Sequence, residues 1–357
     1  MFNSNEKYFS ELLLALDDMA LQKEIYVPSS FWREATLKIA EEICRLGVEH
    51  FRSYRLPLSY FVPTYGCPGN FFSKEQTNYL IQGLEDSALK INKPKLALEN
   101  FLNGQASAMA DYRVLKASDN EKSPPFLHLF SESSVGSPVE RFEFGSRFFS
   151  RSSLNYLLGL AFLKKHLGES EVENVLEIGG GFGSLGEVLS STKIPNLRYI
   201  DIDIPPTSFV AQYYLTGVLG EENVATYAQT KELAEIDIEA LPMASVLCSW
   251  QIERVVGEVD LFVNFISFQE MEPHIVENYL KHVSRLKTKW VLLRNMREGK
   301  QIKKGAGSVG VEVPILTDDY IAMLPDYDLV ERNVLPFGFT TVDGYHSELL
   351  LLKRKST

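Results

Sequence analysis

The stretch VENVLEIGGGFGSLGEVL, from Val172 to Leu189, decides the fold. Its apolar run up to Ile178 predicts a short buried strand, and a helix is predicted to begin near Ser184. Glycine fills the turn between them, at Gly179, Gly180, Gly181 and Gly183. Glycine lets a backbone turn sharply and lets a ligand approach it closely. Because open α/β sheets bind ligands at the carboxyl ends of their strands, this turn is predicted to form part of a binding site.

Two kinds of ligand fit a glycine turn of this type. The segment 181–186 matches the dinucleotide motif G-x-G-x-x-G, and an aspartate follows about 20 residues later. Glu177 favours the other kind, because it ends the strand and is expected to point at whatever occupies the turn. A pyrophosphate would meet a second negative charge there, whereas the sulfonium and ammonium of S-adenosylmethionine would be stabilised. The segment therefore predicts an S-adenosylmethionine-dependent methyltransferase, with an NAD(P)-dependent oxidoreductase as the alternative.

The rest of the chain predicts an α/β fold in which a mainly helical N-terminal part precedes a Rossmann-like sheet. Apolar runs alternate with helical stretches such as 207–219 and 273–287, which indicates parallel strands, and these runs are 172–178, 197–204, 259–266 and 289–295. The last two runs, 327–333 and 346–353, have only a loop between them and predict an antiparallel hairpin. This is the sheet pattern of class I methyltransferases.

The N-terminal third shows helical spacing from residue 31 and again over 73–90 and 93–116, with an aromatic loop at 54–72. A stretch rich in Ser, Pro and charge at 117–138 predicts a linker. We therefore expect a helical domain over 1–140, which covers the acceptor or forms a homodimer contact, and a methyltransferase domain over 141–357.

Composition narrows the class of protein. The net charge of −11 over 357 residues argues against a nucleic-acid partner. The three cysteines, Cys44, Cys67 and Cys248, are too far apart for a zinc site, so no metal is predicted. The N-terminus lacks the pattern of a signal peptide, and no segment approaches the roughly 20 apolar residues of a membrane span. These features predict a cytoplasmic protein.

Polar residues at the ends of the next strands are the candidates for further cofactor contacts. Asp201 and Asp203 share one face of the second strand, and Asp203, nearer its end, is favoured for the ribose hydroxyls of the cofactor. The alternative is that this aspartate caps the helix 207–219. Both 223–228 and 244–249 fit the third strand, and Ser249 and Trp250 are candidates for flanking the adenine. The tryptophan fits a core position equally well.

The fourth strand leads into DLFVNFISFQEM, residues 260–271. Asn264, Ser267 and Glu270 follow one another at three-residue spacing, where this architecture faces the methyl group. We assign Asn264 to the cofactor, and Ser267 and Phe268 to the acceptor.

With these segments, the chain resembles the sugar O-methyltransferase family of class I methyltransferases. The resemblance covers most of the chain from about residue 50, and the matching stretches are SYFVPTYG (59–66), ESSVGSP (132–138), FGSRFFSRSSLNYLLGL (144–160), VLEIGGGFGSLGEV (175–188), IDIPPTSFVAQYYL (202–215) and DLFVNFISFQEM. It implies S-adenosylmethionine as cofactor, S-adenosylhomocysteine as product and a small sugar-type acceptor. A non-sugar hydroxyl in natural-product assembly and a non-catalytic assembly protein are the alternatives.

A sugar hydroxyl is a weak acid, so its methylation requires a general base or a metal. Glu270 is the first candidate for the base, and His274 lies one helical turn further on. His346 is a further candidate, because the loop before the last strand is expected at the cofactor face together with Tyr345. The basic segment 294–313 predicts either a solvated loop or a lid that holds a phosphate, and its cations are Arg294, Arg297, Lys300, Lys303 and Lys304.

Overall fold

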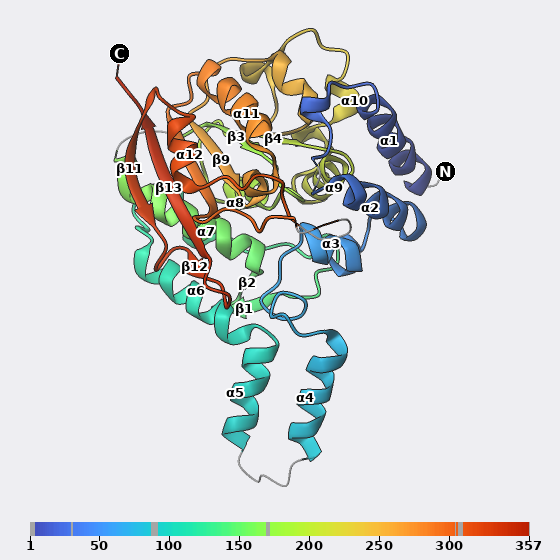
Figure 1. Cartoon of the computed structure of the whole chain (residues 1–357), viewed down its shortest axis with the longest axis vertical. Coiled ribbons are helices and arrows are strands. Elements are labelled where there is room, and N and C mark those ends of the chain that lie inside the picture. The colour runs from blue at the N-terminus through green and yellow to red at the C-terminus, as the bar shows by residue number, and fades with distance from the viewer. Residues whose placement is uncertain are drawn as a thin grey trace.

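The computed structural model describes residues 4–29, 31–86, 92–168, 172–303, 305 and 310–356. Its centre is a nine-stranded sheet with the order β11-β13-β10-β9-β3-β4-β7-β5, and β12 pairs with β13 (Figure 1). The strands of this sheet are β3 (Asn174–Ile178), β4 (Arg198–Asp203), β5 (Val224–Ala225), β7 (Ala244–Cys248), β9 (Leu261–Phe265), β10 (Trp290–Met296), β11 (Tyr327–Asn333), β12 (Phe339–Thr340) and β13 (His346–Arg354).

The sheet confirms the predicted fold class. The strands from β10 across to β5 pair in parallel, and β13 runs antiparallel to β10 and β11. This is a mostly parallel sheet with antiparallel C-terminal strands, as the sequence predicted. Both candidates for the third strand are strands: β7 pairs with β4, and the short β5 extends the sheet beyond β7.

Helices cover both faces of the sheet, because successive residues of each strand point to opposite sides. Val175 faces a core built with the helices α7, α8 and α9, and Leu176 faces a core built with α11 and α12. These helices are α7 (Arg151–Leu167), α8 (Ser184–Ser191), α9 (Thr207–Leu219), α11 (Pro273–Arg285) and α12 (Thr317–Ala322), with the short α10 (Tyr227–Thr230) after β5. Two small strand pairs lie outside the main sheet. They are the antiparallel pair of β1 (Phe142–Phe144) with β2 (Arg147–Phe149) and the parallel pair of β6 (Ile236–Asp237) with β8 (Val255–Val256).

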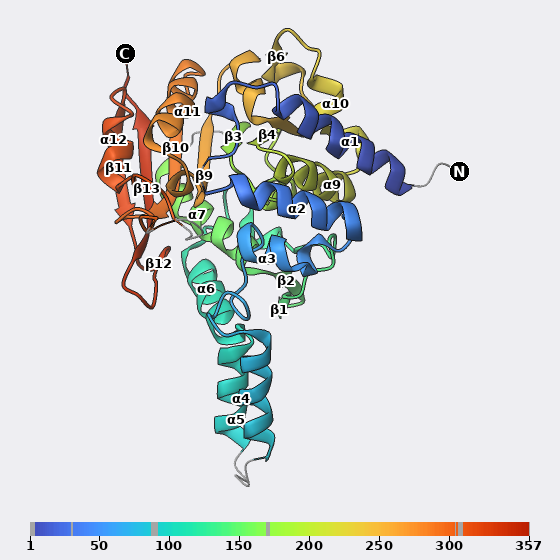
Figure 2. The ribbon, with the colours of Figure 1, turned by 45° about the vertical axis from the view of Figure 1, so that its right-hand side comes forward.

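The N-terminal part is mainly helical and lies against the sheet domain, except for a projecting pair of helices. Its helices are α1 (Ser4–Met19), α2 (Arg33–Leu46), α3 (Arg55–Tyr60), α4 (Lys74–Asp86), α5 (Asn92–Leu102) and α6 (Gln105–Ser118). Helix α6 packs on α7, and α1 lies beside α9. Helices α4 and α5 extend away from the body as an antiparallel pair (Figure 2).

Three predictions for this part were wrong in detail. The stretch 54–72 contains the short helix α3, and the predicted helix 93–116 is two helices, because Gly104 has a left-handed backbone between α5 and α6. The predicted linker 117–138 packs into the protein, since Leu127, Phe130 and Glu132 are all buried. N-terminal side chains share one hydrophobic cluster with the sheet, so the cores do not mark where one domain ends and the next begins. The domain boundary at residue 140 therefore stays a prediction. No helix in the described part of the chain is long and apolar enough to cross a membrane.

Candidate functional site

A cavity of about 140 Å³ lies at the carboxyl ends of β3, β4 and β9. Its walls come from the glycine turn, from the segments that follow β4 and β9, from α7 and α11, and from the N-terminal part. The sequence-predicted residues that line it are Gly179, Gly180, Gly181, Asp203, Ser267 and Glu270. The predicted residues that do not line it are Glu177, Gly183, Asp201, Ser249, Trp250, Asn264, Phe268, His274, Tyr345 and His346.

The glycine turn lines the cavity with backbone atoms that carry no side chains. Gly179 has φ 72°, and a Cβ there would lie 2.1 Å from the Ser267 hydroxyl oxygen. A Cβ on Gly180 would lie 2.5 Å from a carboxylate oxygen of Asp201. No larger residue fits these two positions, so a ligand can approach the backbone closely. Gly183 instead precedes α8 and packs towards Leu215.

Glu177 and Asp201 lie together beneath the glycine turn. They are partners in the register of β3 and β4, so their side chains share one face of the sheet. Glu177 accepts hydrogen bonds from the hydroxyls of Tyr156 at 2.7 Å and Tyr199 at 2.5 Å. Asp201 accepts one from the backbone N–H of Gly180 at 3.2 Å, and its other oxygen has no partner among the described residues.

Asp203 continues the same face one step further and reaches the cavity. Its carboxylate accepts hydrogen bonds from the backbone N–H groups of Gly181 at 3.1 Å and Ile204 at 2.7 Å. Of the two aspartates proposed for the ribose, Asp203 therefore lines the cavity, whereas Asp201 supports the turn from below. The segment does not end in a simple helix cap, since α9 shows no side-chain cap and begins at Thr207.

The pKa values of these three acids are raised, so they resist ionisation. Burial, only partly offset by the two tyrosine hydroxyls, raises the pKa of Glu177 to about 7. Burial raises the pKa of Asp203 to about 7 as well, against the opposing effect of its backbone hydrogen bonds. Burial and the neighbouring carboxyls of Glu177 and Asp203 hold the pKa of Asp201 well above its usual range. A positive charge in the cavity would favour the ionised forms of all three groups.

The expectation that Glu177 points at the ligand needs correction. Its side chain is fully buried, because the two tyrosines hold it on the α7 side of the sheet. Tyr156, one of these two tyrosines, lines the cavity, whereas Glu177 does not. Glu177 is therefore joined to the cavity through Tyr156 and does not line it.

Ser249 and Trp250 lie outside the cavity, each held by a contact elsewhere in the protein. The Ser249 hydroxyl donates to the carbonyl of Tyr26 at 2.6 Å, and Trp250 packs edge-on against Tyr227. The wall on this side of the cavity is apolar. It consists of Val27, Ile204, Ile275 and Tyr279.

The segment after β9 presents two polar side chains to the cavity, Ser267 and Glu270. Ser267 lines it, while Asn264 is buried and donates to the Ile178 carbonyl at 2.8 Å and the Ser267 oxygen at 2.6 Å. Phe268 points into the core, where it stacks near Tyr279. Asn264 thus positions Ser267 and the turn, and Phe268 contributes to packing.

Ile266 lines the cavity with an unusual backbone. Its φ is 73°, which is costly for a β-branched residue, and its N–H donates to the Arg294 carbonyl at 2.7 Å. Strain of this kind persists where surrounding contacts enforce it, and it concentrates at functional sites.

Glu270 is a buried carboxylate at the outer side of the cavity. It accepts a hydrogen bond from the indole N–H of Trp32 at 3.1 Å and forms an ion pair with Lys300 at 2.7 Å. Both of its oxygens are therefore engaged by donors from distant parts of the chain. Lys304 of the basic segment and residues 306–309 lie outside the described residues.

His274, Tyr345 and His346 are not brought to the cavity. His274 is exposed on α11. His346 begins β13, and its ring nitrogen Nδ1 lies 2.6 Å from a carboxylate oxygen of Glu298. The sheet order explains this, because β10 and β9 stand between β13 and the glycine turn, and adjacent strands are about 4.8 Å apart.

Asn155 is a cavity residue that the sequence patterns missed. Its side-chain oxygen accepts from the guanidinium of Arg294 at 2.8 Å, and Arg294 is itself fully buried. A guanidinium can only donate, so this contact fixes the amide with its NH₂ group free to face the cavity. Burial lowers the pKa of Arg294 to about 10, which leaves it charged at neutral pH.

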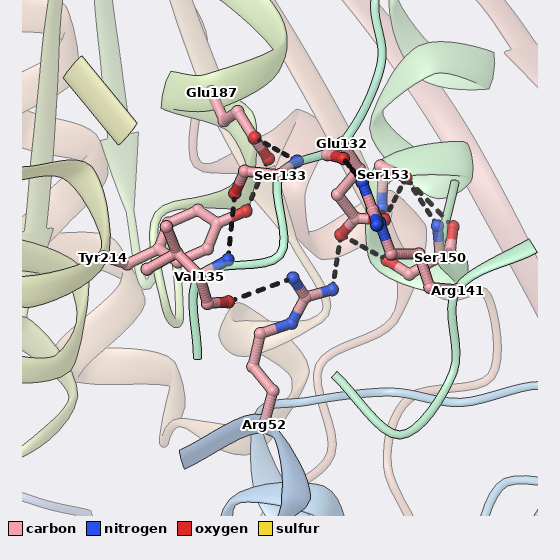
Figure 3. Close-up of polar contacts among 9 residues, drawn as sticks. All are labelled: Arg52, Glu132, Ser133, Val135, Arg141, Ser150, Ser153, Glu187 and Tyr214. Atoms are coloured by element: carbon pink, nitrogen blue, oxygen red, sulfur yellow. Dashed lines mark hydrogen bonds and ion pairs between the residues drawn. The ribbon is translucent and has the colours of Figure 1, made fainter. Parts of the chain in front are cut away.

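A buried polar network behind the turn joins four parts of the chain (Figure 3). Arg52, which follows α2, forms a buried ion pair with Glu132. Glu132 also accepts from the hydroxyl of Ser150, the N-cap residue of α7, at 2.8 Å. Arg52 lies over the ring of Phe182 at 5.0 Å, within the glycine segment. The network therefore connects the N-terminal part to both the start of α7 and the turn.

The same network holds the helix that follows the turn. Glu187 of α8 accepts a hydrogen bond from the Tyr214 hydroxyl and another from the backbone N–H of Ser133 at 2.7 Å (Figure 3). Burial and the nearby charge of Glu132 raise the pKa of Glu187.

Within the described residues, no group of three or more histidine, cysteine or acidic side chains could hold a metal ion.

The comparisons with known proteins give structural likeness only. No protein-family model and no curated protein sequence matches the chain. Among solved structures, it is similar to magnesium protoporphyrin IX methyltransferase from Synechocystis with bound SAH, at 12% identity and a TM-score of 0.38, over 70% of this chain and 95% of that one. It is also similar to the mitomycin 7-O-methyltransferase MmcR, at 14% identity and a TM-score of 0.35, over 96% and 76% of the two chains. A third is an S-adenosylmethionine-dependent methyltransferase from Clostridium acetobutylicum, at 12% identity and a TM-score of 0.37, over 56% and 92%.

Proposed function

We propose that this chain is an S-adenosylmethionine-dependent O-methyltransferase that acts on a hydroxyl of a sugar or of a sugar-containing small molecule. The observation that carries the proposal is the bare glycine turn with Glu177 and Asp201 buried beneath it and the half-buried Asp203 lining the cavity beside it. A sulfonium and an ammonium group would stabilise these carboxylates, whereas a pyrophosphate would be repelled by them. The charge of the site therefore favours this cofactor over a dinucleotide.

The lining residues fit the parts of such a cofactor. Asp203 would accept hydrogen bonds from the ribose hydroxyls, and the NH₂ group of Asn155 would donate to the carboxylate of the methionine part. Ile204, Ile275 and Tyr279 line the same cavity and would provide an apolar surface suited to adenine. The backbone of the glycine turn would lie against the methionine part.

The chain contributes positioning and proton transfer to the reaction. When bound, S-adenosylmethionine supplies a sulfonium-linked methyl group that passes to the acceptor oxygen and leaves S-adenosylhomocysteine. Glu270 takes the proton of the acceptor hydroxyl, since it is the carboxylate at the outer side of the cavity. Ser267 and the strained Ile266 hold the acceptor in line.

Support for a sugar as the acceptor comes from the family resemblance of two segments. These are IDIPPTSFVAQYYL and DLFVNFISFQEM, and both contribute residues to the cavity wall. The alternative within the same chemistry is a non-sugar hydroxyl of a natural product.

Calorimetric titration with S-adenosylmethionine and with NAD tests the cofactor. We expect S-adenosylmethionine to bind and NAD not to bind, and Asp203→Asn to weaken binding at least about tenfold, as the loss of a hydrogen bond to a charged group predicts. Asp328→Asn, an exposed change on β11, is the matched control and should bind as the wild type does. Tighter binding of NAD would contradict the assignment.

The acceptor is tested by release of S-adenosylhomocysteine over a panel of nucleotide sugars, free glycosides and non-sugar alcohols. Release with sugars is expected. Release with non-sugar alcohols alone would refute the sugar part of the proposal while leaving the methyltransferase part intact.

A further inference from the structure

A second cavity of about 700 Å³ lies next to the first, and we call it the outer chamber. It shares Tyr60 and Glu270 with the cofactor cavity, so the two spaces meet at these side chains. All of its lining residues belong to the described part of the chain. Its volume falls in the range of about 300–1,000 Å³ that is usual for small-molecule sites.

The carboxylates and the cations of the outer chamber differ in how freely they could bind a ligand. Its cations are Lys38, Arg55 and Lys300, and its carboxylates are Glu42 and Glu270. Glu42 accepts a hydrogen bond from the backbone N–H of Leu56 at 3.0 Å, and Glu270 is engaged by Trp32 and Lys300. Both carboxylates are thus committed to internal contacts.

Two of the three cations, Arg55 and Lys38, are by contrast accessible, whereas Lys300 is paired with Glu270. Arg55 is exposed, and no side-chain partner of its guanidinium is found among the described residues. Lys38 pairs with Glu34, but both side chains are more than half exposed, so the pair contributes little. The outer chamber therefore presents positive charge to an incoming ligand.

One wall of the outer chamber is aromatic. Tyr60 packs against Trp32 with ring centroids 5.6 Å apart and edge-on to Phe31 at 6.4 Å. Lys300 lies over the Phe31 ring at 4.7 Å, so one cation is next to this wall. An aromatic surface beside cations suits an organic anion that also has a ring or other apolar face.

We propose that the outer chamber binds the acceptor through an anionic group, a phosphate or a carboxylate, held by Lys300, Arg55 and Lys38. This inference rests on the proposed function and names the acceptor class more closely as an anionic alcohol. The anion would draw Lys300 from Glu270 and so free one carboxylate oxygen at the border of the two cavities. The acceptor O–H bond then breaks with its proton moving to Glu270, and the oxygen forms its new bond to the methyl carbon as the carbon–sulfur bond breaks.

Binding of defined probes tests the outer chamber without requiring turnover. The probes are glucose, glucose 1-phosphate, glucuronate and inorganic pyrophosphate, titrated calorimetrically with and without S-adenosylmethionine. We expect the anionic probes to bind at least tenfold more tightly than glucose, and added salt to weaken them. A preference between glucose 1-phosphate and glucuronate would identify the anion as a phosphate or a carboxylate.

Variants assign this binding to the outer chamber. Lys300→Gln and Arg55→Gln should each weaken the anionic probes about tenfold, while Lys281→Gln, an exposed lysine on α11, should leave them unchanged. The proposal is overturned if no anionic probe binds more tightly than glucose, or if both variants bind as the wild type does. The same titrations report the binding of S-adenosylmethionine alone, so a failure of the cofactor assignment is seen separately.

Discussion

At the scale of single residues, the acids around the glycine turn determine what the cavity can hold. Glu177, Asp201 and Asp203 lie on one face of two neighbouring strands, and burial keeps their pKa values high. Three such groups in one site repel each other when ionised, so the empty site retains protons that a cationic ligand would displace. Ligand binding and proton release are therefore linked.

This linkage predicts how stability depends on pH. A carboxyl whose pKa is raised from near 4 to about 7 on folding binds more protons in the folded chain than in the unfolded one. The stability that the folded chain gains from this extra proton binding is fully present below pH 4 and is lost as the pH rises through 7. Between pH 5 and 7.5 the wild type should therefore lose at least about 1 kcal/mol more free energy of unfolding than Asp203→Asn does.

Urea unfolding at a series of pH values measures this difference. Saturating S-adenosylmethionine should flatten the wild-type curve, because the cation favours the ionised carboxyls. Parallel curves for the wild type and Asp203→Asn would show that this carboxyl ionises normally in the folded chain.

Asn155 provides a second prediction at this scale. In Asn155→Asp the new carboxylate can still accept from Arg294, so the melting temperature should be kept or raised. The cavity loses its NH₂ donor, and the affinity for S-adenosylmethionine should fall at least about tenfold. Thermal unfolding and calorimetric titration measure the two effects. Unchanged affinity would mean that this amide does not contact the cofactor.

At the scale of elements, the sequence predicted the sheet better than the site. Alternation of apolar runs and helical stretches gave the parallel strands, and the turn residues Gly179 to Gly181 followed from their spacing alone. Periodicity could put Asp201 and Asp203 on one face, but it could not show that the strand end brings only Asp203 to the open space. Trp32 and Tyr60 were missed because their contact with the cavity is tertiary, across more than half of the chain.

The buried ion pair of Arg52 and Glu132, which joins the elements around the turn, allows a prediction about stability. Arg52→Met leaves Glu132 as a buried charge without a cation, which costs about 3–5 kcal/mol. The double change Arg52→Met/Glu132→Gln removes both charges and should recover part of that loss. Because Arg52 also covers Phe182, the single change should weaken the binding of S-adenosylmethionine as well.

Urea unfolding of the single and double variants separates these effects, with the exposed change Arg45→Met on α2 as the control. The control should unfold as the wild type does. A double variant as unstable as Arg52→Met would mean that packing of the arginine, and not its charge, supports the turn.

At the scale of the whole molecule, the N-terminal part contributes in two different ways. The segment before α2 crosses to the carboxyl edge of the sheet, where Val27 and Pro28 line the cavity and the Tyr26 carbonyl accepts from Ser249. The pair α4 and α5 instead projects away from the body (Figure 2), and no residue of α4 is buried. The segment before α2 therefore belongs to the site, whereas the pair α4 and α5 does not.

Hydrogen exchange distinguishes these two regions. Helix α4 has 13 residues and none of them is buried, and α5, of 11 residues, projects beside it, so amides of α4 and α5 should exchange much faster than those of β3 and β4. Saturating S-adenosylmethionine should slow exchange in peptides covering Glu24 to Ser29, because a ligand in the cavity contacts and orders this segment. It should leave α4 and α5 unchanged, which makes them an internal control. Slowing in α4 and α5 without slowing at Glu24 to Ser29 would mean that the cofactor binds elsewhere than in this cavity.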